Sequence, residues 1–370
     1  MKILCSKDKL STAISYTQRA VSVRSTLALL DGILFEAAGD RIKLTGYDME
    51  TGVEAILPGD VFEEGSIVLN ARMLGDIVRK LPEDVVTVEI DAQQIAIITS
   101  GNSQFKIKGM DAQGFPKLPE MEETEKVEMP QKLLKQMINQ TLFAVSTDES
   151  RPAFNGILFN SMGHKIEMVA VDGFRLALRR YACEEEQPEA AFLIPGKALK
   201  EIPPILSDSG DVTIYATQNH IQFDMGDVKL ISRLIQQEFM NYNSILPDTS
   251  SSQVIVNTKA FYQAVERAAL VVPSEDKRFP MNITFKGTEE AETAMVIRAN
   301  TEVGNLHDEI PVSISGERLD VDFNPRYFID ALKVITDEMV CLKFNGSLGP
   351  CIIEPTEGNA FCYLVLPLRK

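Results

Sequence analysis

The sequence contains few of the residues on which common catalytic and metal sites are built. Only three of its 370 residues are histidines, and none has the i+4 partner or nearby cysteine pair that a zinc site needs. The five cysteines are odd in number and form no CxxC pair, which argues against a disulfide framework and against a zinc ribbon. We therefore predict that the cysteines are buried, reduced thiols: Cys5, Cys183, Cys341, Cys351 and Cys362.

Several common catalytic and ligand-binding sequence motifs are also missing. No GxxxxGK[ST] loop, HExxH helix or GxSxG elbow occurs, so the common phosphate-binding, metalloprotease and hydrolase sites lack their frames. The acidic runs at 184–186 and 289–290 are typical of solvated loops, because adjacent carboxylates do not converge on one ion. The sequence thus predicts no metal site and no cofactor. It has no apolar run of the roughly 18 residues that a membrane span needs and no signal-peptide pattern, so we expect a soluble, cytoplasmic protein.

What the chain does contain is ordinary globular composition, with 45% hydrophobic and 24% charged residues. Its length allows two or three independent cores, since single domains usually run to one or two hundred residues. The net charge of −16, if spread evenly, would repel nucleic acid. The distribution of charge along the chain therefore matters more than its total.

The sequence repeats itself at an offset of about 124 residues. Asp31-Gly32-Ile33-Leu34-Phe35 recurs as Asn155-Gly156-Ile157-Leu158-Phe159, and the segment 114–119 recurs loosely at 238–242. A third, weaker copy begins near Ser252, where 281–285 takes the place of the first strand. Three starts of a helical pattern, at 70–72, 195–197 and 324–326, also correspond. Three copies therefore fill the chain.

In each copy, the residue pattern predicts a strand, a helix and three strands, and this order occurs twice. Each copy is therefore predicted to be an α+β domain with two helices. The predicted helices are 7–21, 71–81, 131–145, 196–206, 258–270 and 324–336. The polar stretches 120–125 and 248–252 are typical of linkers, and they predict domains at 1–125, 126–250 and 251–370.

The predicted helices are basic although the chain is acidic. They contain 14 Lys or Arg against five Asp or Glu, which leaves a net charge of about −25 for the rest of the chain. Lysine and arginine are good helix formers on any solvated face, which explains one such helix but less easily six. If the copies close into a ring with helices inside and sheets outside, the result is a basic bore and an acidic exterior. Sequence-independent phosphate contacts would then let the ring slide on DNA.

Three motifs resemble those of the bacterial sliding clamp family, the beta subunit of the replicative DNA polymerase. They are Val171-Asp172-Gly173-Phe174-Arg175-Leu176-Ala177, the segment 239–247 that ends Ile245-Leu246-Pro247, and Tyr363-Leu364-Val365-Leu366-Pro367-Leu368-Arg369. The likeness spans the whole chain. It implies three tandem copies of a two-helix, eight-strand clamp domain and a head-to-tail homodimer that closes a ring. The dimer contact would involve edge strands and a helix end: Gln104, Phe105, Lys106, Ile107, Lys108, Leu270 and Val271.

The resemblance also implies a partner-peptide pocket between the second and third domains. Its matching positions are mostly apolar: Phe154, Val171, Gly173, Phe174, Arg175, Leu176, Met240, Ser244, Ile245, Asn324, Tyr327, Leu348, Leu364, Leu366, Pro367, Leu368 and Arg369. Such a surface suits short peptides with hydrophobic anchors. Four positions depart from the family pattern, because Val171 replaces threonine, Phe174 histidine, Met240 proline and Ser244 arginine. Without the family, these residues are ordinary core and strand-end positions.

Eight basic residues match DNA contacts of the family or lie on the predicted bore helices: Arg24, Arg151, Lys132, Lys135, Lys197, Lys200, Lys259 and Arg267. A lone surface lysine is usually only solvated, so the set indicates more than any member.

These features predict a non-enzymatic processivity clamp on duplex DNA. The implied partners are a second copy of the chain, an ATP-driven clamp loader, the replicative DNA polymerase, and repair polymerases, mismatch-repair proteins and ligase that carry clamp-binding motifs. Two alternatives stay open at this point: a repeat scaffold that binds peptides but not DNA, and an enzyme whose site is assembled from dispersed residues.

Overall fold

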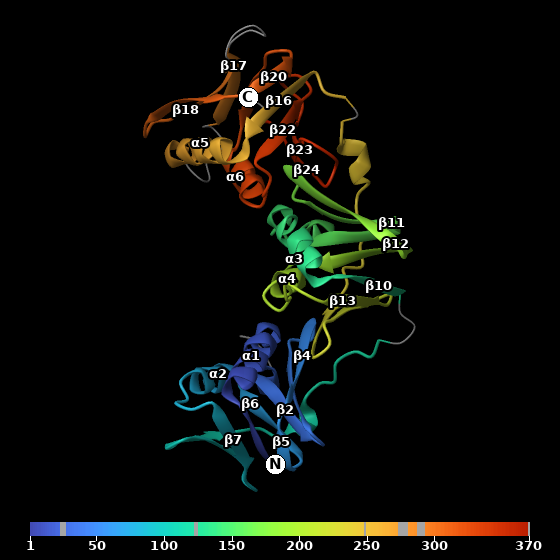
Figure 1. Cartoon of the computed structure of the whole chain (residues 1–370), viewed down its shortest axis with the longest axis vertical. Coiled ribbons are helices and arrows are strands. Elements are labelled where there is room, and N and C mark those ends of the chain that lie inside the picture. Colours follow the sequence, from blue (N-terminus) through green and yellow to red (C-terminus); the bar gives the residue numbers. More distant parts are fainter. Residues whose placement is uncertain (23–26, 122–124, 248, 273–279, 287–292, 369–370) are drawn as a thin grey trace. The chain divides into compact units, whose positions relative to one another are not determined.

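A computed structural model describes residues 1–22, 27–121, 125–247, 249–272, 280–286 and 293–368 (Figure 1). The chain divides into two compact units. Unit 1 comprises Met1–Leu134 and Lys197–Leu234, and unit 2 comprises Lys135–Gly196 and Ile235–Lys370. Each sheet of the protein lies within one of these units.

The first copy of the repeat has the predicted order, in which a strand, a helix and three strands occur twice in succession. Its elements are β1 (Lys2–Ser6), α1 (Lys7–Thr17), β2 (Gly32–Ala38), β3 (Arg41–Tyr47), β4 (Thr51–Pro58), β5 (Asp60–Glu63), β6 (Gly65–Asn70), α2 (Ala71–Arg79), β7 (Val85–Ile90), β8 (Ile95–Ser100) and β9 (Ser103–Lys108). The short strand β5 is an addition that the sequence pattern did not predict.

The second copy replaces separate strands by one long hairpin. Its elements are β10 (Glu125–Pro130), α3 (Gln131–Asn139), β11 (Gly156–Val171), β12 (Arg175–Pro195), α4 (Gly196–Glu201), β13 (Asp211–Ala216), β14 (His220–Asp224) and β15 (Val228–Arg233). The pairing of β11 with β12 shifts register on either side of Gly163, so the hairpin is bent there.

The third copy returns to the order of the first. Its elements are β16 (Ser252–Asn257), α5 (Thr258–Val271), β17 (Met281–Lys286), β18 (Ala294–Asn300), β19 (Asn305–Pro311), β20 (Ser313–Gly316), β21 (Asp320–Phe323), α6 (Pro325–Lys333), β22 (Met339–Phe344), β23 (Cys351–Pro355) and β24 (Phe361–Val365). The predicted strand at 281–285 is confirmed as β17, which pairs with β18 and β21. The α+β class is therefore confirmed.

All six predicted helices exist, but most end earlier than the periodicity suggested. The predicted helix 196–206 stops at Glu201 because Pro203 and Pro204 follow, and proline cannot continue the hydrogen-bond ladder. Their starts are better predicted because polar caps define them. The Asn70 and Asn324 side chains accept backbone N–H bonds from Met73 and Arg326 at 2.9 and 3.0 Å.

The repeated glycine at the start of the first long strand has a steric cause. In β2, a Cβ on Gly32 would lie 3.0 Å from the Leu69 carbonyl oxygen of the neighbouring strand β6. In β11, a Cβ on Gly156 would lie 2.7 Å from the Ile194 carbonyl oxygen of β12. Glycine allows this close approach of paired backbones in both copies.

The strands form four antiparallel sheets whose orders are β5-β1-β7-β8-β9, β10-β13-β14-β15-β4-β3-β2-β6, β11-β12-β24-β23-β22-β16-β20 and β19-β18-β17-β21. Two pairings join different copies of the repeat. β15 pairs with β4, with Leu230 opposite Val53, and β12 pairs with β24, with Leu176 opposite Leu364. Strands β9 and β19 each end a sheet.

Two pairs of helices lie against these sheets. In unit 1, α1 packs beside α2 and turns Leu10, Ala13 and Ile14 into the core (Figure 1). In unit 2, α5 packs beside α6, where the rings of Phe261 and Phe328 meet edge to face at 5.6 Å. Aromatic pairs of this geometry add to the apolar burial that holds a helix pair on its sheet.

The cysteine prediction was right for four residues and wrong for one. Cys5, Cys341, Cys351 and Cys362 are buried free thiols, and burial raises the pKa of Cys5 to about 12. Cys183 is only half-buried, because it lies in the middle of β12, beside the register shifts around Gly163 where the pairing with β11 is irregular.

Candidate functional site

The two strand ends and the tail that carry the family motifs meet in unit 2. Val171 ends β11, Leu176 is the second residue of β12 and Leu364 lies near the end of β24, and all three are at most 4% exposed. They share one apolar cluster, against which Phe154 and Met240 pack from the side. Above this floor, three apolar side chains are open to solvent: Phe174 (43% exposed), Ile245 (37%) and Leu366 (39%). We call these three residues and their floor the apolar patch.

The turn between β11 and β12 presents Phe174 in a defined orientation. Gly173 has φ +92°, a backbone conformation that favours glycine, and a Cβ there would also approach Nη1 of Arg151 to 3.3 Å. The Asp172 carboxylate accepts backbone N–H bonds from Phe174 and Arg175 at 2.9 and 3.1 Å. These bonds fix the turn, so Phe174 is held outward.

An aromatic and cationic stack borders the patch. The ring of Phe174 stacks on that of Tyr327 with centroids 6.1 Å apart and 16° between the planes. The Arg175 guanidinium lies 4.9 Å from the Tyr327 ring centroid and pairs with Asp172 at 2.8 Å and with Asp330 on α6. Arg175 is therefore neutralised and rigid, and it supports the patch rather than presenting a free charge.

The chain end is attached to the patch through its backbone. The Leu366 N–H donates to the Phe174 carbonyl at 2.9 Å, and the Leu368 N–H donates to the Asp322 carbonyl at 2.8 Å. Pro367 lies between them and Leu368 is half-buried. The last predicted member of the site, Arg369, lies outside the described residues. The structure thus brings the tail against the turn that holds Phe174.

The segment after β15 contributes a short 3₁₀ turn, η6 (Tyr242–Ile245), that carries Ile245. Its Ser244 is exposed, and the Ser244 hydroxyl donates back to the Asn241 carbonyl at 2.7 Å.

Leu348 lies on the loop between β22 and β23 and is 79% exposed. Asn324 acts as the N-cap of α6, which places Tyr327 one turn into that helix. Among the departures from the family pattern, Val171 is buried and Met240 is half-buried, whereas Phe174 adds to the exposed apolar area.

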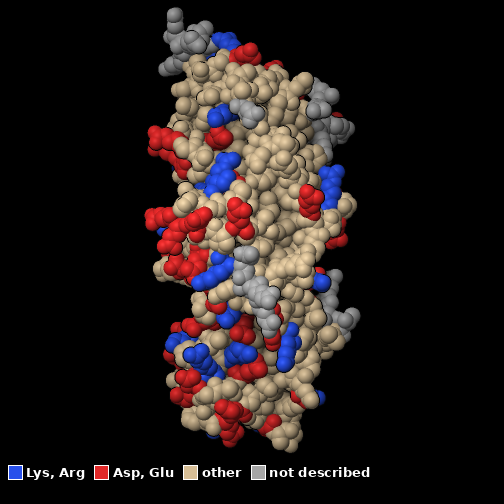
Figure 2. All heavy atoms as spheres, turned by 90° about the vertical axis from the view of Figure 1, so that its right-hand side faces the viewer, with Lys and Arg blue, Asp and Glu red and all other residues tan. Residues whose placement is uncertain are grey.

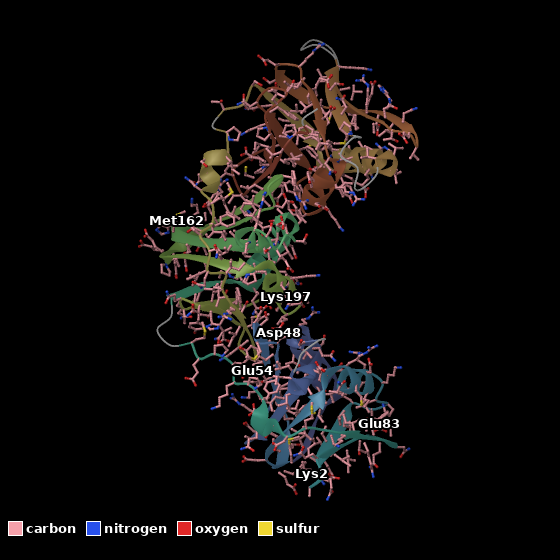
Figure 3. All side chains as sticks on the ribbon, turned by 180° about the vertical axis from the view of Figure 1, so that it is seen from behind. Lys2, Asp48, Glu54, Glu83, Met162 and Lys197 are labelled. Atoms are coloured by element: carbon pink, nitrogen blue, oxygen red, sulfur yellow. The ribbon has the colours of Figure 1, made fainter. Side chains whose placement is uncertain are left out.

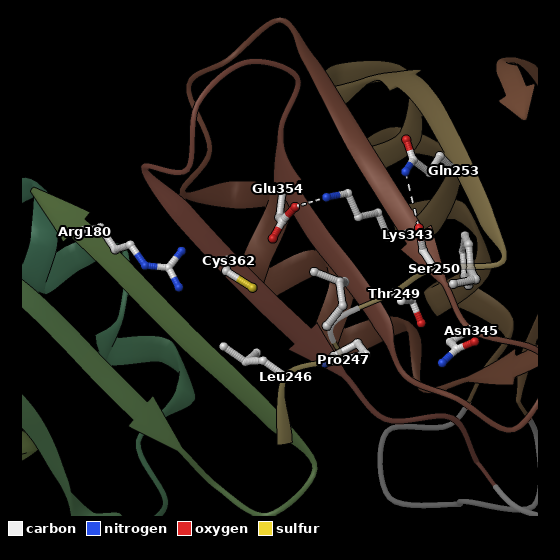
Figure 4. A pocket seen from close by; sticks show the side chains of 12 residues that line it. Arg180, Leu246, Pro247, Thr249, Ser250, Gln253, Lys343, Asn345, Glu354 and Cys362 are labelled. Carbon is white, nitrogen blue, oxygen red and sulfur yellow. Dashed lines mark hydrogen bonds and ion pairs between the residues drawn. The ribbon is translucent and has the colours of Figure 1, made fainter. Parts of the chain in front are cut away.

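A cavity of about 530 Å³ lies beside the same segment (Figure 4). Leu246 and Pro247 line it together with strand residues that include Arg180, Lys343 and Glu354. Lys343 donates to Glu354 at 2.6 Å across it, which raises the pKa of the lysine. The cavity is therefore polar, in contrast to the apolar patch.

The predicted DNA-contacting residues are spread over the helices. Within the observed helix bounds, 12 Lys or Arg accompany five Asp or Glu, so the basic excess remains. Lys132, Lys200 and Lys259 are exposed on α3, α4 and α5, and Lys135 of α3 is half-buried. Arg151 is exposed on the loop before β11, and Arg24 lies outside the described residues. By contrast, the face in Figure 2 carries acidic and basic side chains side by side in the part of the chain that the structure describes.

Two of these cations already have carboxylate partners. Lys197 of α4 donates to Asp48 at 2.9 Å (Figure 3), and this hydrogen bond raises the pKa of the lysine. Arg267 of α5 donates to Asp308 of β19 at 2.7 Å. Both pairs are partly exposed, so each contributes little to the stability of the fold.

The predicted dimer residues lie on β9 and at the end of α5, which packs against β19; among the described strands, β9 and β19 each pair on one side only and so have an open edge. On β9, Gln104, Phe105, Lys106 and Lys108 are exposed and Ile107 is buried. On the other edge, Leu270 at the end of α5 is 83% exposed, and Val271 beside it is half-buried. The sequence pattern missed Val303, which is 81% exposed beside β19. It also missed Met73 and Ile77 of α2, which line a hollow of about 430 Å³ with Phe105. The sequence signal that could have indicated this hollow is Met73, an apolar residue among the charged residues of α2.

Three family models together cover nearly the whole chain. The N-terminal domain of the DNA polymerase III beta subunit matches residues 1–119, the central domain matches 128–241 and the C-terminal domain matches 243–369. The chain belongs to the DNA polymerase III beta subunit family. The resemblance seen in the sequence motifs is thereby confirmed, and this beta subunit is a sliding clamp.

Individual relatives agree over full length. The Bacillus subtilis beta sliding clamp is 34% identical over all of both chains, and that of Halalkalibacterium halodurans is 33% identical over all of both chains. The crystal structure of the B. subtilis DNA polymerase sliding clamp matches this beta subunit with a TM-score of 0.94 at 34% identity, covering 100% of this chain and 99% of that one. A putative DNA polymerase III beta subunit from Eubacterium rectale matches with a TM-score of 0.92 at 34% identity, covering 99% and 98%.

Two further findings concern what this beta subunit contains. Among the described residues, no group of three or more His, Cys, Asp or Glu is placed to hold a metal ion. No helix in the described ranges is both long enough and apolar enough to cross a membrane.

Proposed function

We propose that two copies of this chain close into a ring around duplex DNA through the pairing of β9 with β19 of the other copy. The support comes from the two pairings that join copies within the chain. β15 is the last strand of the second copy and pairs with β4, the third strand after the helix of the first. β24, the last strand of the third copy, pairs with β12, the corresponding strand of the second. In both cases the last strand of one copy pairs with the third strand after the first helix of the copy before it, or its counterpart. If the first copy follows the third copy of another chain, the same rule pairs β9 with β19.

The chemistry of the two open edges supports this pairing. Exposed strand edges are templates for pairing with another chain, and both edges carry open apolar side chains, Phe105 on one and Leu270 and Val303 on the other. Lys106 and Lys108 on β9 are basic, whereas Asp308 and Glu309 on β19 are acidic. Because the two edges differ, the contact is head to tail, and two chains with three domains each satisfy closure. The proposed domains are 1–125, 126–250 and 251–370.

In this ring the helices face DNA and the sheets face solvent. The basic excess of the helices supports this orientation, since phosphate neutralisation by lysine and arginine is sequence-independent and allows sliding. Lys132, Lys200 and Lys259 are the exposed cations that carry the proposal, and Lys197 and Arg267 join by exchanging their carboxylates for phosphate. Retention comes from topology, so no single contact needs to be strong.

We propose that the apolar patch binds short peptide segments of replication and repair proteins. Three exposed apolar side chains above a buried apolar floor suit a peptide with two hydrophobic anchors. The partners are the clamp loader, the replicative polymerase, and repair polymerases, mismatch-repair proteins and ligase. The chain itself has no catalytic role in this scheme, ATP is hydrolysed by the loader, and the protein acts in the cytoplasm at the nucleoid.

The decisive experiment measures retention on DNA. The protein is loaded with a clamp loader and ATP onto nicked circular DNA, and its retention in moderate salt is compared before and after linearisation. Release only after linearisation supports the ring. Equal loss from both forms indicates ordinary surface binding, and failure to load favours a peptide-binding scaffold that does not encircle DNA.

A further inference from the structure

A buried carboxylate lies behind the apolar patch. Glu167 on β11 is 2% exposed, although an unpaired carboxylate in the interior is costly. One of its oxygens accepts from Arg180 Nε at 3.0 Å and lies 3.2 Å from Lys165 Nζ. The other accepts from the Tyr242 hydroxyl at 2.6 Å. Burial alone raises the pKa of Glu167, but the bonds from Tyr242 and Arg180 outweigh burial and hold the pKa below its ordinary value.

Tyr242 connects this carboxylate to the surface. It is the first residue of η6, the turn whose last residue is Ile245, and it is only 5% exposed. Its ring packs in the same apolar cluster as Val171, Leu176 and Leu364, the floor of the patch. One side chain thus joins the patch floor, the turn that carries Ile245 and the buried charge on β11.

The segment that follows the turn has less support. Leu246 and Pro247 line the cavity of about 530 Å³, so that side of the segment faces open space rather than a packed layer (Figure 4). Arg180, which donates to Glu167, lines the same cavity. Leu246 packs against the apolar cluster on its other side, so the segment is supported on one side only, and the position of Ile245 depends more on the polar attachment of Tyr242.

We propose that Glu167 is a positioning residue for peptide binding, which holds the turn of Ile245 in place through the Tyr242 hydroxyl and is itself held by Arg180 and Lys165. This inference rests on the proposed peptide-binding role of the apolar patch. If the turn that carries Ile245 is already ordered, peptide binding does not have to include the entropic cost of ordering it. The affinity for the peptide then depends on the contact between Tyr242 and Glu167, although the peptide does not touch it. Hydrogen bonds to charged groups are stronger than neutral ones, which suits Glu167 to this task.

Two substitutions test the contact. Tyr242→Phe removes one oxygen atom, and Glu167→Gln removes the charge while it keeps the shape. Tyr363→Phe is the matched control, because Tyr363 is also buried in unit 2 and its hydroxyl has no hydrogen-bond partner among the described residues. The first readout is hydrogen exchange of residues 240–246 in the protein without peptide. The second is the affinity of a fluorescein-labelled decapeptide with a central Leu-Phe pair.

The expected result is local. Tyr242→Phe and Glu167→Gln each accelerate exchange of 240–246 and weaken the decapeptide about tenfold, equivalent to 1.4 kcal/mol. Exchange in β7 and β8 of unit 1 stays as in the wild type. The double variant is no worse than Tyr242→Phe alone, because without the Tyr242 hydroxyl the charge of residue 167 no longer acts on the turn. The Tyr363→Phe control changes neither readout.

Other outcomes separate the two proposals. Unchanged exchange of 240–246 in Tyr242→Phe overturns the positioning role, whatever the peptide does. Additive losses in the double variant overturn it as well. If the wild-type protein fails to bind the decapeptide, the exchange data still decide whether Glu167 holds the turn, and the peptide-binding role is then the proposal that fails. If Glu167→Gln does not fold, Tyr242→Phe alone decides.

Discussion

Substitution of Leu270 by alanine tests the proposed ring most directly. Leu270 lies in the last turn of α5, next to the open edge of β19, and 83% of it is exposed in a single chain. Alanine is a better helix former than leucine, so the fold of the chain should be unaffected, with a change in unfolding free energy within about 0.5 kcal/mol. A loss of dimerisation then reports on the interface alone.

The magnitude follows from the apolar surface that the dimer buries. Leucine to alanine removes three carbon groups, each worth about 0.8 kcal/mol when fully buried, so a residue that is 83% exposed in the single chain loses roughly 2 kcal/mol per interface. A ring of two chains has two identical interfaces, which doubles the loss to roughly 4 kcal/mol. Since 1.4 kcal/mol corresponds to tenfold, the dimer dissociation constant should rise roughly 10³-fold.

Sedimentation velocity over a dilution series, or exchange of fluorescently labelled subunits, measures this constant. Leu348→Ala is the matched control, because Leu348 is also in unit 2, is 79% exposed and lies on the loop between β22 and β23, outside β9, β19 and α5. Leu348→Ala should leave the dimer intact and weaken binding of the decapeptide. Leu270→Ala should weaken the dimer and leave decapeptide binding unchanged. A dissociation constant for Leu270→Ala within threefold of the wild type would refute the pairing of β9 with β19.

Three further predictions follow from the site. Deletion of residues 366–370 removes Leu366 and its bond to the Phe174 carbonyl and should abolish decapeptide binding in an anisotropy assay while sparing the dimer; retained binding would contradict the patch assignment. Reversal of Lys132 and Lys200 to glutamate should lower the amount of protein loaded onto circular DNA without lowering the melting temperature, because fewer phosphates are neutralised, whereas unchanged loading would contradict the bore assignment. Because burial, with the Glu167 contact, raises the pKa of Tyr242 to about 12, its contribution to stability is complete below pH 10 and falls between pH 10 and 12 by up to about 1.4 kcal/mol per pH unit. Denaturant melts should show a smaller alkaline loss in Tyr242→Phe, and an identical loss would count against the contact.

The lowered pKa of Glu167 acts at the opposite end of the pH range. A depressed folded-state pKa contributes stability above the unfolded value near 4.5, and this contribution is lost as the pH falls through the folded value. Acid unfolding of Glu167→Gln should therefore be less steep below about pH 4.5 than that of the wild type. Parallel acid curves would show that Glu167 does not titrate as described.

The sequence by itself determined the class of the fold and the family. The repeat of about 124 residues, the strand and helix periods and the cap residues depend on local chemistry, which a linear pattern records. Gly32 and Gly156 illustrate this, because the close approach of a paired strand demands glycine in both copies. Helix ends were predicted less well, because 3₁₀ turns at Gln18–Ala20 and Leu142–Ala144 follow α1 and α3 inside the predicted helices 7–21 and 131–145.

Only the tertiary structure decided how the functional residues come together. Val171, Tyr242 and Leu364 are far apart in sequence, and nothing in their spacing places them in one cluster. The same is true of Glu167, whose partners lie on two strands and a turn, so as an isolated glutamate it carried no signal in the chain. Pairing between distant strands sets these neighbours, and register is a property of the whole sheet rather than of any one segment.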